Sequence, residues 1–250
     1  MNDVFNIIGD YAAEPTLADW INPKKINWYT LSGNPNAMNM LMDNPEKIHW
    51  SGLSKNPSAM DLLKNDPTKI DWSELSSNPN AIDLLKANQD KIDWMWLSEN
   101  PSAMDMLKNN PANIDWGMLS SNPSAMDVLK NNPDKIRWRH LSGNPNAMDL
   151  LKANPDKINW ARLSRNPNAM DLLKNNPEKI NWAFLSCNLN MSLLDDNLDK
   201  INWEDLSNNP NAMDLLKAHP DKINWFWLSG NPSIFVEDLE RRAAILDALR

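Results

Sequence analysis

Ten tryptophans stand at a nearly constant spacing along the chain, and this column constrains the fold more than any other feature. The interval is 22 residues at every step but one, where it is 21. Self-similarity at a fixed period is typical of repeat architectures, in which each unit is stabilised by its neighbours. The sequence therefore predicts one array of about ten units. The column consists of Trp28, Trp50, Trp72, Trp94, Trp116, Trp138, Trp160, Trp182, Trp203 and Trp225.

Each unit carries the apolar pattern of two short helices. The first has the sequence Ala-Met-Asp-Leu-Leu-Lys, and its apolar residues fall on one arc of a helix, as Ala147, Met148, Leu150 and Leu151 do in one unit. The second helix contains the Trp and a Leu three residues later. Helices this short are marginal in water by themselves, so each must pack on the other and on neighbouring units.

The polar residues before each helix predict its start. The residue before Ala is Asn or Ser throughout the regular units, so we expect residues such as Asn146 to be the N-cap of the first helix. The second helix could start at the Pro of Asn-Pro-Asp-Lys-Ile or after the polar residue that precedes Trp. We favour the latter, with Asn159 as N-cap, because Ile158 and Leu163 then have the spacing of a hydrophobic staple.

These patterns predict an all-α fold, an α-helical solenoid of about ten 22-residue two-helix repeats with terminal capping elements. Units stacked at the usual 8–10 Å between packed helices would form a rod or arc roughly 90 Å long. End units need polar outer surfaces. We therefore divide the chain into an N-terminal cap (residues 1–21), the tandem repeats (22–232) and a C-terminal capping helix (233–250).

The C-terminal helix is predicted from Val236, Leu239, Ala243 and Leu246, which would share one helical face opposite charged residues. A separate irregularity falls at residues 188–198. One Ala is missing there, Leu189 and Leu198 replace the two prolines, and Asp195 replaces a Lys. This unit is interpreted as sequence drift or, alternatively, as a bend or an exposed apolar contact.

Composition excludes several classes of function. The formal net charge of −8 argues against a nucleic-acid surface, where Lys and Arg would cluster. No apolar run approaches the roughly 18 residues that a membrane-spanning helix needs, and no signal peptide precedes the repeats. A single cysteine fits a reducing compartment. We therefore expect an intracellular protein that binds neither nucleic acid nor membrane.

Motifs of catalysis are missing as well. His49, His140 and His219 occupy three different places in the repeat, so they form no repeated site, and Cys187 has no partners at metal-ligand spacing. There is no Gly-rich phosphate loop and no nucleophile elbow. We expect no enzyme activity, no cofactor and no metal.

Comparison of the units distinguishes two kinds of position. Positions that stay the same in every unit are needed for stacking, whereas positions that vary are not. The Asn-Pro, Ala-Met, Leu-Leu, Ile, Trp and Leu-Ser positions recur, and we expect the Trp and Met columns to be core. The two residues after each Trp vary and should point outward. They include aromatic, Met and Arg residues, which are enriched at interface cores. Either they bind a partner or they cover a groove between units. The predicted partner-binding residues are Met95, Trp96, Met118, Arg139, His140, Arg162, Phe184 and Trp227.

The phrase Asn-Pro-Asn-Ala-Met-Asp-Leu-Leu-Lys-Ala-Asn-Pro-Asp-Lys-Ile-Asn-Trp-x-x-Leu-Ser resembles short Asn-Pro/Trp tandem repeats in uncharacterised proteins of giant DNA viruses of amoebae and algae. The resemblance covers roughly residues 22–232. It implies a giant-virus origin, an α-helical repeat fold and a place in the host cytoplasm or the virion, but it implies no activity.

Two hypotheses of function follow. The first is a non-catalytic protein–protein interaction scaffold that binds a host or viral protein through the variable residues after Trp. The second is a structural component of the virion or of another assembly, formed by self-association of the chain.

Overall fold

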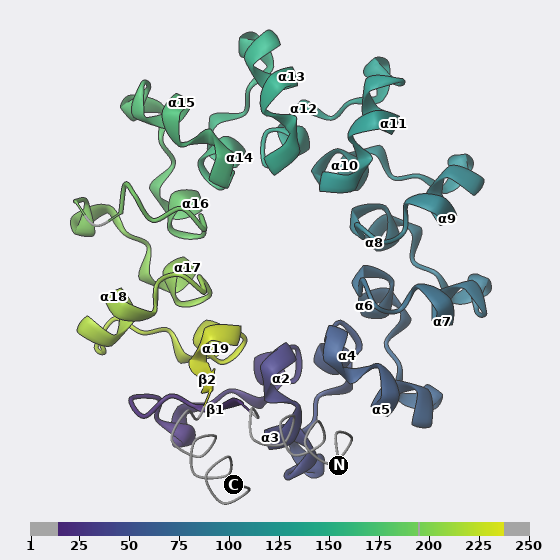
Figure 1. Ribbon diagram of the computed structural model, residues 1–250, viewed down its shortest axis with the longest axis vertical. Helices are drawn as coiled ribbons and strands as arrows, with labels where there is room; N and C mark the ends of the chain where they lie inside the picture. Colours follow the sequence, from purple (N-terminus) through teal and green to yellow (C-terminus); the bar gives the residue numbers. More distant parts are fainter. Residues whose placement is uncertain (1–14, 195, 238–250) are drawn as a thin grey trace, which may run out of the picture.

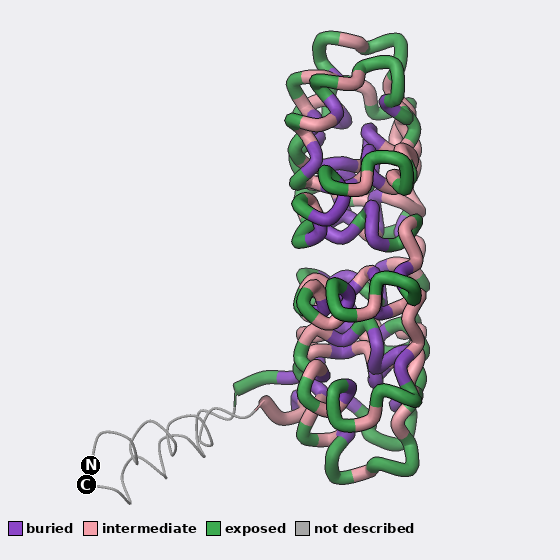
Figure 2. Tube along the Cα trace, turned by 90° about the vertical axis from the view of Figure 1, so that its right-hand side faces the viewer, coloured by how far each residue is buried: buried purple, intermediate pink, exposed green. Residues whose placement is uncertain are grey.

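The computed structural model describes residues 15–194 and 196–237, and in it the helical units form a closed ring (Figure 1). One circle of helices faces the centre and a second circle lies outside it. Seen edge-on, the ring is a flat band whose buried residues run inside the wall (Figure 2). The predicted helical content and the regular periodicity of the units are confirmed.

The inner helices begin at the Trp column, and the polar residue before each Trp is their usual N-cap. The Asn159 side chain, for example, accepts a hydrogen bond from the backbone N–H of Arg162 at 3.0 Å, which confirms the favoured start of this helix. In the described residues these helices are α2 (Trp28–Ser32), α4 (Trp50–Ser54), α6 (Trp72–Ser77), α8 (Trp94–Glu99), α10 (Trp116–Ser121), α12 (Trp138–Leu141), α14 (Trp160–Ser164), α16 (Trp182–Ser186), α17 (Trp203–Ser207) and α19 (Trp225–Ser229).

The outer helices begin one residue after the repeated Ala. Those in the described residues are α3 (Met38–Met42), α5 (Met60–Asn65), α7 (Ile82–Lys86), α9 (Met104–Asn109), α11 (Met126–Lys130), α13 (Met148–Ala153), α15 (Met170–Lys174) and α18 (Met213–Ala218).

The N-cap predicted for the outer helices is wrong. A 3-10 turn, η10 (Pro145–Ala147), precedes α13, and Asn144 caps this turn by accepting the backbone N–H of Asn146 at 2.9 Å. The helical path starts earlier than predicted because Pro145 has no N–H to satisfy and its fixed φ suits a first helical position. The other turns of this kind are η2 (Pro35–Ala37), η4 (Pro57–Ala59), η8 (Pro123–Ala125), η12 (Pro167–Ala169) and η15 (Pro232–Ile234).

A second set of 3-10 turns precedes every inner helix of the described residues except α19. It occupies the Pro-Asp-Lys segment that was the alternative start of the inner helix, and an extended residue such as Ile158 separates the two. The set consists of η1 (Pro23–Lys25), η3 (Pro45–Lys47), η5 (Pro67–Lys69), η6 (Gln89–Lys91), η7 (Pro111–Asn113), η9 (Pro133–Lys135), η11 (Pro155–Lys157), η13 (Pro177–Lys179) and η14 (Leu198–Lys200).

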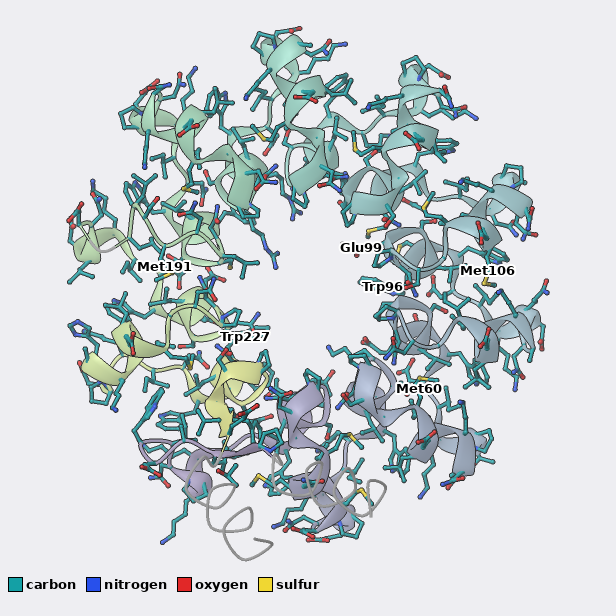
Figure 3. The ribbon with its side chains drawn as sticks, viewed as in Figure 1. Met60, Trp96, Glu99, Met106, Met191 and Trp227 are labelled. Atoms are coloured by element: carbon teal, nitrogen blue, oxygen red, sulfur yellow. The ribbon has the colours of Figure 1, made fainter. Side chains whose placement is uncertain are left out.

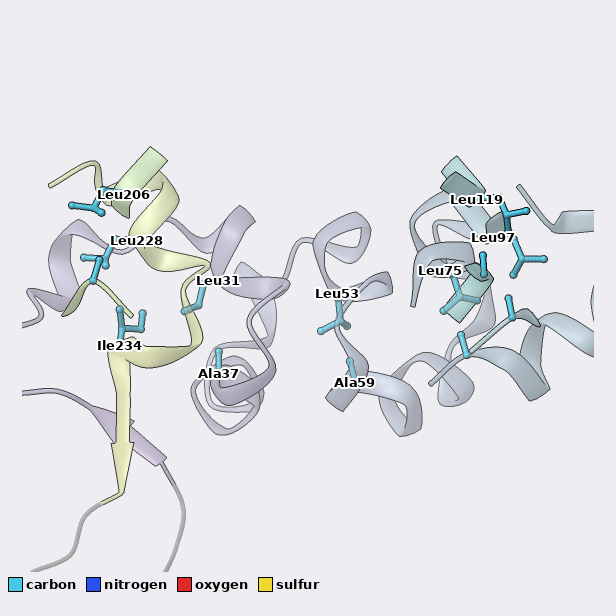
Figure 4. Close-up of a cluster of buried hydrophobic side chains, with 14 of the residues drawn as sticks. Leu31, Ala37, Leu53, Ala59, Leu75, Leu97, Leu119, Leu206, Leu228 and Ile234 are labelled. Atoms are coloured by element: carbon cyan, nitrogen blue, oxygen red, sulfur yellow. The ribbon is translucent and has the colours of Figure 1, made fainter. Parts of the chain in front are cut away.

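Leucine and alanine, not tryptophan, form the fully buried core. Leu119 of an inner helix and Ala125 and Leu129 of the next outer segment have no exposed surface, and the same holds at the matching positions around the ring (Figure 4). The Trp rings pack against this cluster but stay half-exposed, as most of the Met column does. The prediction that Trp lies inside the core is therefore corrected: it covers the edge of the core.

A lysine lies over the exposed side of most of these rings. Lys157 Nζ, for example, is 4.6 Å from the centre of the Trp138 ring, within the range of a cation–π interaction. In one unit Asn113 replaces this lysine, and against Trp203 a His219 ring packs instead at 5.0 Å. The other internal pairs are Lys47–Trp28, Lys69–Trp50, Lys91–Trp72, Lys135–Trp116, Lys179–Trp160 and Lys200–Trp182.

Buried asparagines join each unit to the one before it. The Asn122 side-chain amide donates to the carbonyls of Ser98 and Asn100, at 3.1 and 3.0 Å, and its oxygen accepts the backbone N–H of Ser124 at 2.9 Å. Each such amide donates the hydrogen bonds that water would otherwise donate to these carbonyls, which are buried at the junction. The column, which we call the asparagine ladder, consists of Asn34, Asn56, Asn78, Asn100, Asn122, Asn144, Asn166, Asn188, Asn209 and Asn231.

A buried serine makes a second connection. Ser120 Oγ donates to the carbonyl of Trp116 at 2.7 Å and accepts the backbone N–H of Arg137, in the next unit, at 3.0 Å. No buried side-chain nitrogen or oxygen in the described residues lacks a hydrogen-bond partner. The recurring Leu-Ser and Asn-Pro positions thus serve stacking, as predicted, but through specific hydrogen bonds.

The ring closes through the same contacts. The amide of Asn34 donates to the carbonyls of Ser229 and Asn231 at 3.2 and 2.9 Å, and Lys25 Nζ lies 5.0 Å from the centre of the Trp225 ring. Helix α19 therefore packs on α2 as inner helices do elsewhere (Figure 1). The prediction of a rod or arc is wrong, because a small rotation at every junction accumulates to a full turn.

The first and last described segments of the chain meet beside this junction. Strand β1 (Pro15–Leu17) pairs antiparallel with β2 (Phe235–Glu237), and the Ala18 N–H donates to the carbonyl of Ile234 at 2.9 Å. The capping helix predicted over 233–250 is thus wrong at β2, where the chain is extended to join the other end. Residues 1–14, 195 and 238–250, with the rest of both predicted caps, lie outside the described residues.

The irregular unit keeps its place in the ring without an outer helix. Residues 189–191 are irregular and residues 192–194 form a turn. Asn188 still donates to the carbonyl of Asn166 at 3.0 Å, so the asparagine ladder continues through the unit. Leu189 and Leu198 are 49% and 39% exposed. The described residues of this unit therefore lack the outer helix of regular units, and the two leucines that replace proline lie on the surface.

Candidate binding surface on the inner face of the ring

The inner helices turn the variable residues toward the centre of the ring. Trp and the residues three and four positions later share the buried arc, so the residues one, two and five positions after Trp lie on the opposite arc. Trp96, Glu99 and Trp227 accordingly point to the centre, while Met106 of the outer helix α9 lies within the wall of the ring (Figure 3). We call these three columns, at one, two and five residues after Trp, the inner face.

All eight predicted partner-binding residues lie on the inner face. The predicted outward direction is thus correct for each helix, but in a ring this direction leads to the centre. Half of them are clearly exposed and half are partly buried against neighbouring inner helices. Exposed are Met95, Trp96, Arg139 and Trp227, and half-buried are Met118, His140, Arg162 and Phe184.

An aromatic group spans the closing junction. Tyr29 stacks on Phe226 at 6.3 Å between ring centres, and Trp227 packs edge-on against Phe226 at 5.0 Å. Trp227 Nε1 also donates to Glu204 Oε1 at 3.0 Å. Sequence reasoning did not place Tyr29 in the site, because residues so far apart in the chain meet only when the ring closes.

A cavity of about 180 Å³ lies beside this aromatic group. It is bounded by Tyr29 and Trp227, by the glycines Gly33 and Gly230, and by Lys55. Aromatic side chains at a partly desolvated hollow are the usual anchors of a protein interface.

Charge is distributed unevenly around the inner face. Arg139, Arg162 and Arg165 give one arc a positive charge, while Glu204 and Asp205 make another arc negative. The Arg162 guanidinium lies 5.4 Å from the centre of the Phe184 ring, which helps to hold it in place. A partner with a complementary charge pattern would therefore bind in one orientation.

The residues five positions after Trp belong to the inner face although the sequence analysis did not consider them. Arg165 and Glu99 are exposed there. The signal was available, since this column also varies from unit to unit and lies one helical turn from the first residue after Trp. The column is Gly33, Lys55, Ser77, Glu99, Ser121, Gly143, Arg165, Cys187, Asn208 and Gly230.

Cys187 shares the inner face but is not set up as a nucleophile. Burial, reinforced by the negative charge of Asp205, raises the pKa of its thiol to about 11. Because the thiolate is the reactive form, the thiol of Cys187 is inert near neutral pH.

The titratable residues do not converge elsewhere in the described part of the chain. Over residues 15–194 and 196–237, no three His, Cys, Asp or Glu side chains gather as a metal site. His140 lies on the inner face, whereas the rings of His49 and His219 pack against Tyr29 and Trp203. In the same part of the chain, no helix has the length and apolar character needed to cross a membrane.

Comparisons with protein-family models, curated proteins and solved structures give no match. The resemblance to the Asn-Pro/Trp repeats of giant DNA viruses therefore stays a prediction that rests on the repeat motif alone.

Proposed function

We propose that this chain is a non-catalytic interaction scaffold, a closed α-helical solenoid whose inner face binds a protein partner. One observation carries the proposal: the most variable side chains gather on the inner face, away from the leucine core and the asparagine ladder that hold the units together. The core, the asparagine ladder and the serine contacts account for the recurring positions. The exposed residues of the variable positions, such as Met95, Trp96 and Arg139, contribute to none of these, so their residue types can serve recognition.

The chemistry of the inner face favours a protein as the partner. Exposed Met95, Trp96 and Trp227 offer large apolar contacts, and arginines add directional hydrogen bonds. The net charge of −8 and the acidic arc at Glu204 and Asp205 would repel a nucleic acid backbone. A protein of the host cytoplasm or of a virion is the partner that the repeat motif suggests.

Paired charge substitutions test the proposal. Trp96→Asp combined with Phe184→Asp should abolish capture of a partner from infected host cells, because both remove apolar contact from the inner face and bury charge there. Met42→Asp, at a 65% exposed position in the outer helix α3, is the matched control. Helicity by circular dichroism should be unchanged in all variants. Capture that survives the inner substitutions, or that Met42→Asp abolishes equally, would contradict the proposal.

The exposed leucines of the irregular unit favour a second candidate, self-association of rings as a structural or virion component. Leu189 and Leu198 present apolar surface where regular units have proline. Light scattering at high concentration should then show oligomers that Leu189→Asp disperses. A strict monomer at high concentration would count against this candidate.

A further inference from the structure

The arginines of the ring are confined to two successive units. Between residues 15 and 237 the chain has four arginines, Arg137, Arg139, Arg162 and Arg165, and its other cations in this range are lysines, apart from histidine. The two residue types differ in chemistry. A guanidinium offers a planar set of donors that fits phosphate and carboxylate groups with two hydrogen bonds, whereas an ammonium acts as a point charge.

Two of these arginines, Arg162 and Arg165, border a cavity of about 180 Å³ on the inner face beside α12. Gly143 helps to create it, because the matching position carries Ser121 in the preceding unit and Arg165 in the following one. Without a side chain at Gly143, space remains between these two neighbours. The lining residues are Glu99, Ser121, His140, Gly143, Arg162 and Arg165.

The guanidinium groups at this cavity have no acidic partner. Within residues 15–194 and 196–237, every ion pair uses a lysine, and no side-chain hydrogen bond engages Arg162 or Arg165. Glu99 is the one carboxylate in the lining, and it pairs with neither arginine. Stacking on Phe184 orders Arg162 while leaving its donors free. An acidic chain that leaves these arginines unpaired keeps their hydrogen-bonding capacity for another molecule.

The same unit departs from a local rule of the repeat. Arg137 occupies the position where most units have Asn or Asp, and α12 consequently begins without a side-chain cap. Arg137 thus adds a positive charge two positions before Arg139, in place of an Asn or Asp that would cap the helix. Departures of this kind without a local gain are expected at functional sites.

We propose that this cavity binds a small organic anion through a phosphate or carboxylate group. Arg162 and Arg165 would hold the anionic oxygens, with the Ser121 hydroxyl and the His140 imidazole as further donors. The site overlaps the surface proposed for the protein partner, because both use His140 and Arg162. It does not rest on that proposal, since its test needs only small anions and the chain itself.

Titration calorimetry on the full chain at low ionic strength tests the site with three probes: inorganic phosphate, phenyl phosphate and benzoate. We expect one of the organic anions to bind with one-to-one stoichiometry, and a preference for phenyl phosphate over benzoate identifies phosphate as the recognised group. Arg165→Gln should weaken the binding by about tenfold or more, the usual effect of removing one charge-assisted hydrogen bond.

Two further variants separate a built site from general attraction of anions. Gly143→Leu should block binding by filling the cavity without loss of charge. A Cβ there meets only ordinary contacts, at 3.6 Å from the His140 carbonyl and 3.7 Å from the Arg162 carbonyl, so the fold should tolerate it, as circular dichroism would verify. Lys152→Gln, on the outer helix α13, removes one charge elsewhere and should leave the affinity unchanged.

The outcomes decide between binding in the cavity and surface attraction. Loss of binding in Arg165→Gln and Gly143→Leu, with none in Lys152→Gln, supports the site. Absence of binding for all three probes overturns it, and so does an equal effect of Lys152→Gln and Arg165→Gln. Unchanged binding in a folded Gly143→Leu variant would likewise overturn it.

Discussion

The junction that closes the ring and an internal junction, such as that between α10 and α12, are built from the same bonds. At the internal junction the Asn144 amide donates to the carbonyls of Ser120 and Asn122 at 3.0 and 2.9 Å. At the closing junction the Asn34 amide donates to Ser229 and Asn231 at 3.2 and 2.9 Å. The repeat motif itself, rather than residues special to the ends, therefore closes the ring.

The two junctions differ in how the outer segment is made. At an internal junction one continuous stretch of chain forms the outer segment. At the closing junction two separate stretches form it, residues 232–237 and residues 15–25. Pairing of β1 with β2 replaces the covalent link. Closure thus depends on non-covalent contacts without a covalent link, and matched substitutions at the two junctions can test whether the ring stays closed in solution.

The asparagine ladder should give the largest effects. Asn144→Ala and Asn34→Ala each remove two donated hydrogen bonds and one accepted bond, and leave buried carbonyls unsatisfied. We expect each to lower the free energy of unfolding by about 2–4 kcal/mol in chemical denaturation. If the ring were open, water would satisfy the groups around Asn34, and only Asn144→Ala would be costly.

The Trp column should give the next largest effects. Trp138→Ala and Trp225→Ala each remove a half-buried ring that packs on the core under a lysine. We expect losses of about 2–3 kcal/mol, below the 3–5 kcal/mol of a fully buried tryptophan. Thermal and chemical denaturation would measure both, with the exposed outer substitution Met42→Ala as control. A cost near zero for Trp225 alone would mean that closure does not persist in solution.

The lysine partners should give the smallest effects. Lys157→Ala and Lys25→Ala each remove one cation from a Trp ring, at 4.6 and 5.0 Å from its centre. We expect each to cost about 0.5–1 kcal/mol. The longer contact of Lys25 predicts the lower value of the two, and a larger loss at Lys25 than at Lys157 would show that the ammonium has a further role at the closing junction.

Much of the unit could be predicted from the sequence, because local chemistry decides it. The cap formed by Asn159, the pattern of apolar residues and the outward direction of the residues after Trp depend only on helix geometry and residue type. Closure could not be predicted in this way. Asn34 and Asn144 stand in the same motif, and nothing in their neighbourhood distinguishes an array that closes from one that continues.

The recurrence of Asn-Pro predicts a role in stacking, but it does not show that the asparagine side chain makes the hydrogen bonds of the asparagine ladder. The irregular unit carries the missing signal, since Asn188 is kept there although Leu189 replaces the proline. Because the asparagine is kept where the proline is lost, it has a structural role that does not depend on the proline. For the candidate site, the variable pair after Trp predicts His140 and Arg162. Gly143 and Arg165 are predicted only when the position five residues after Trp, one helical turn further on, is included.

Closure also limits how such a chain can vary in length. An open array can gain or lose a unit at little cost, because each unit contacts only its neighbours. In a ring every junction contributes a fixed share of one full turn, so deletion of a 22-residue unit would require all remaining junctions to adopt a new angle. Insertions and deletions of whole units are therefore coupled to the geometry of every junction. The number of units is as much a structural parameter of this protein as its core.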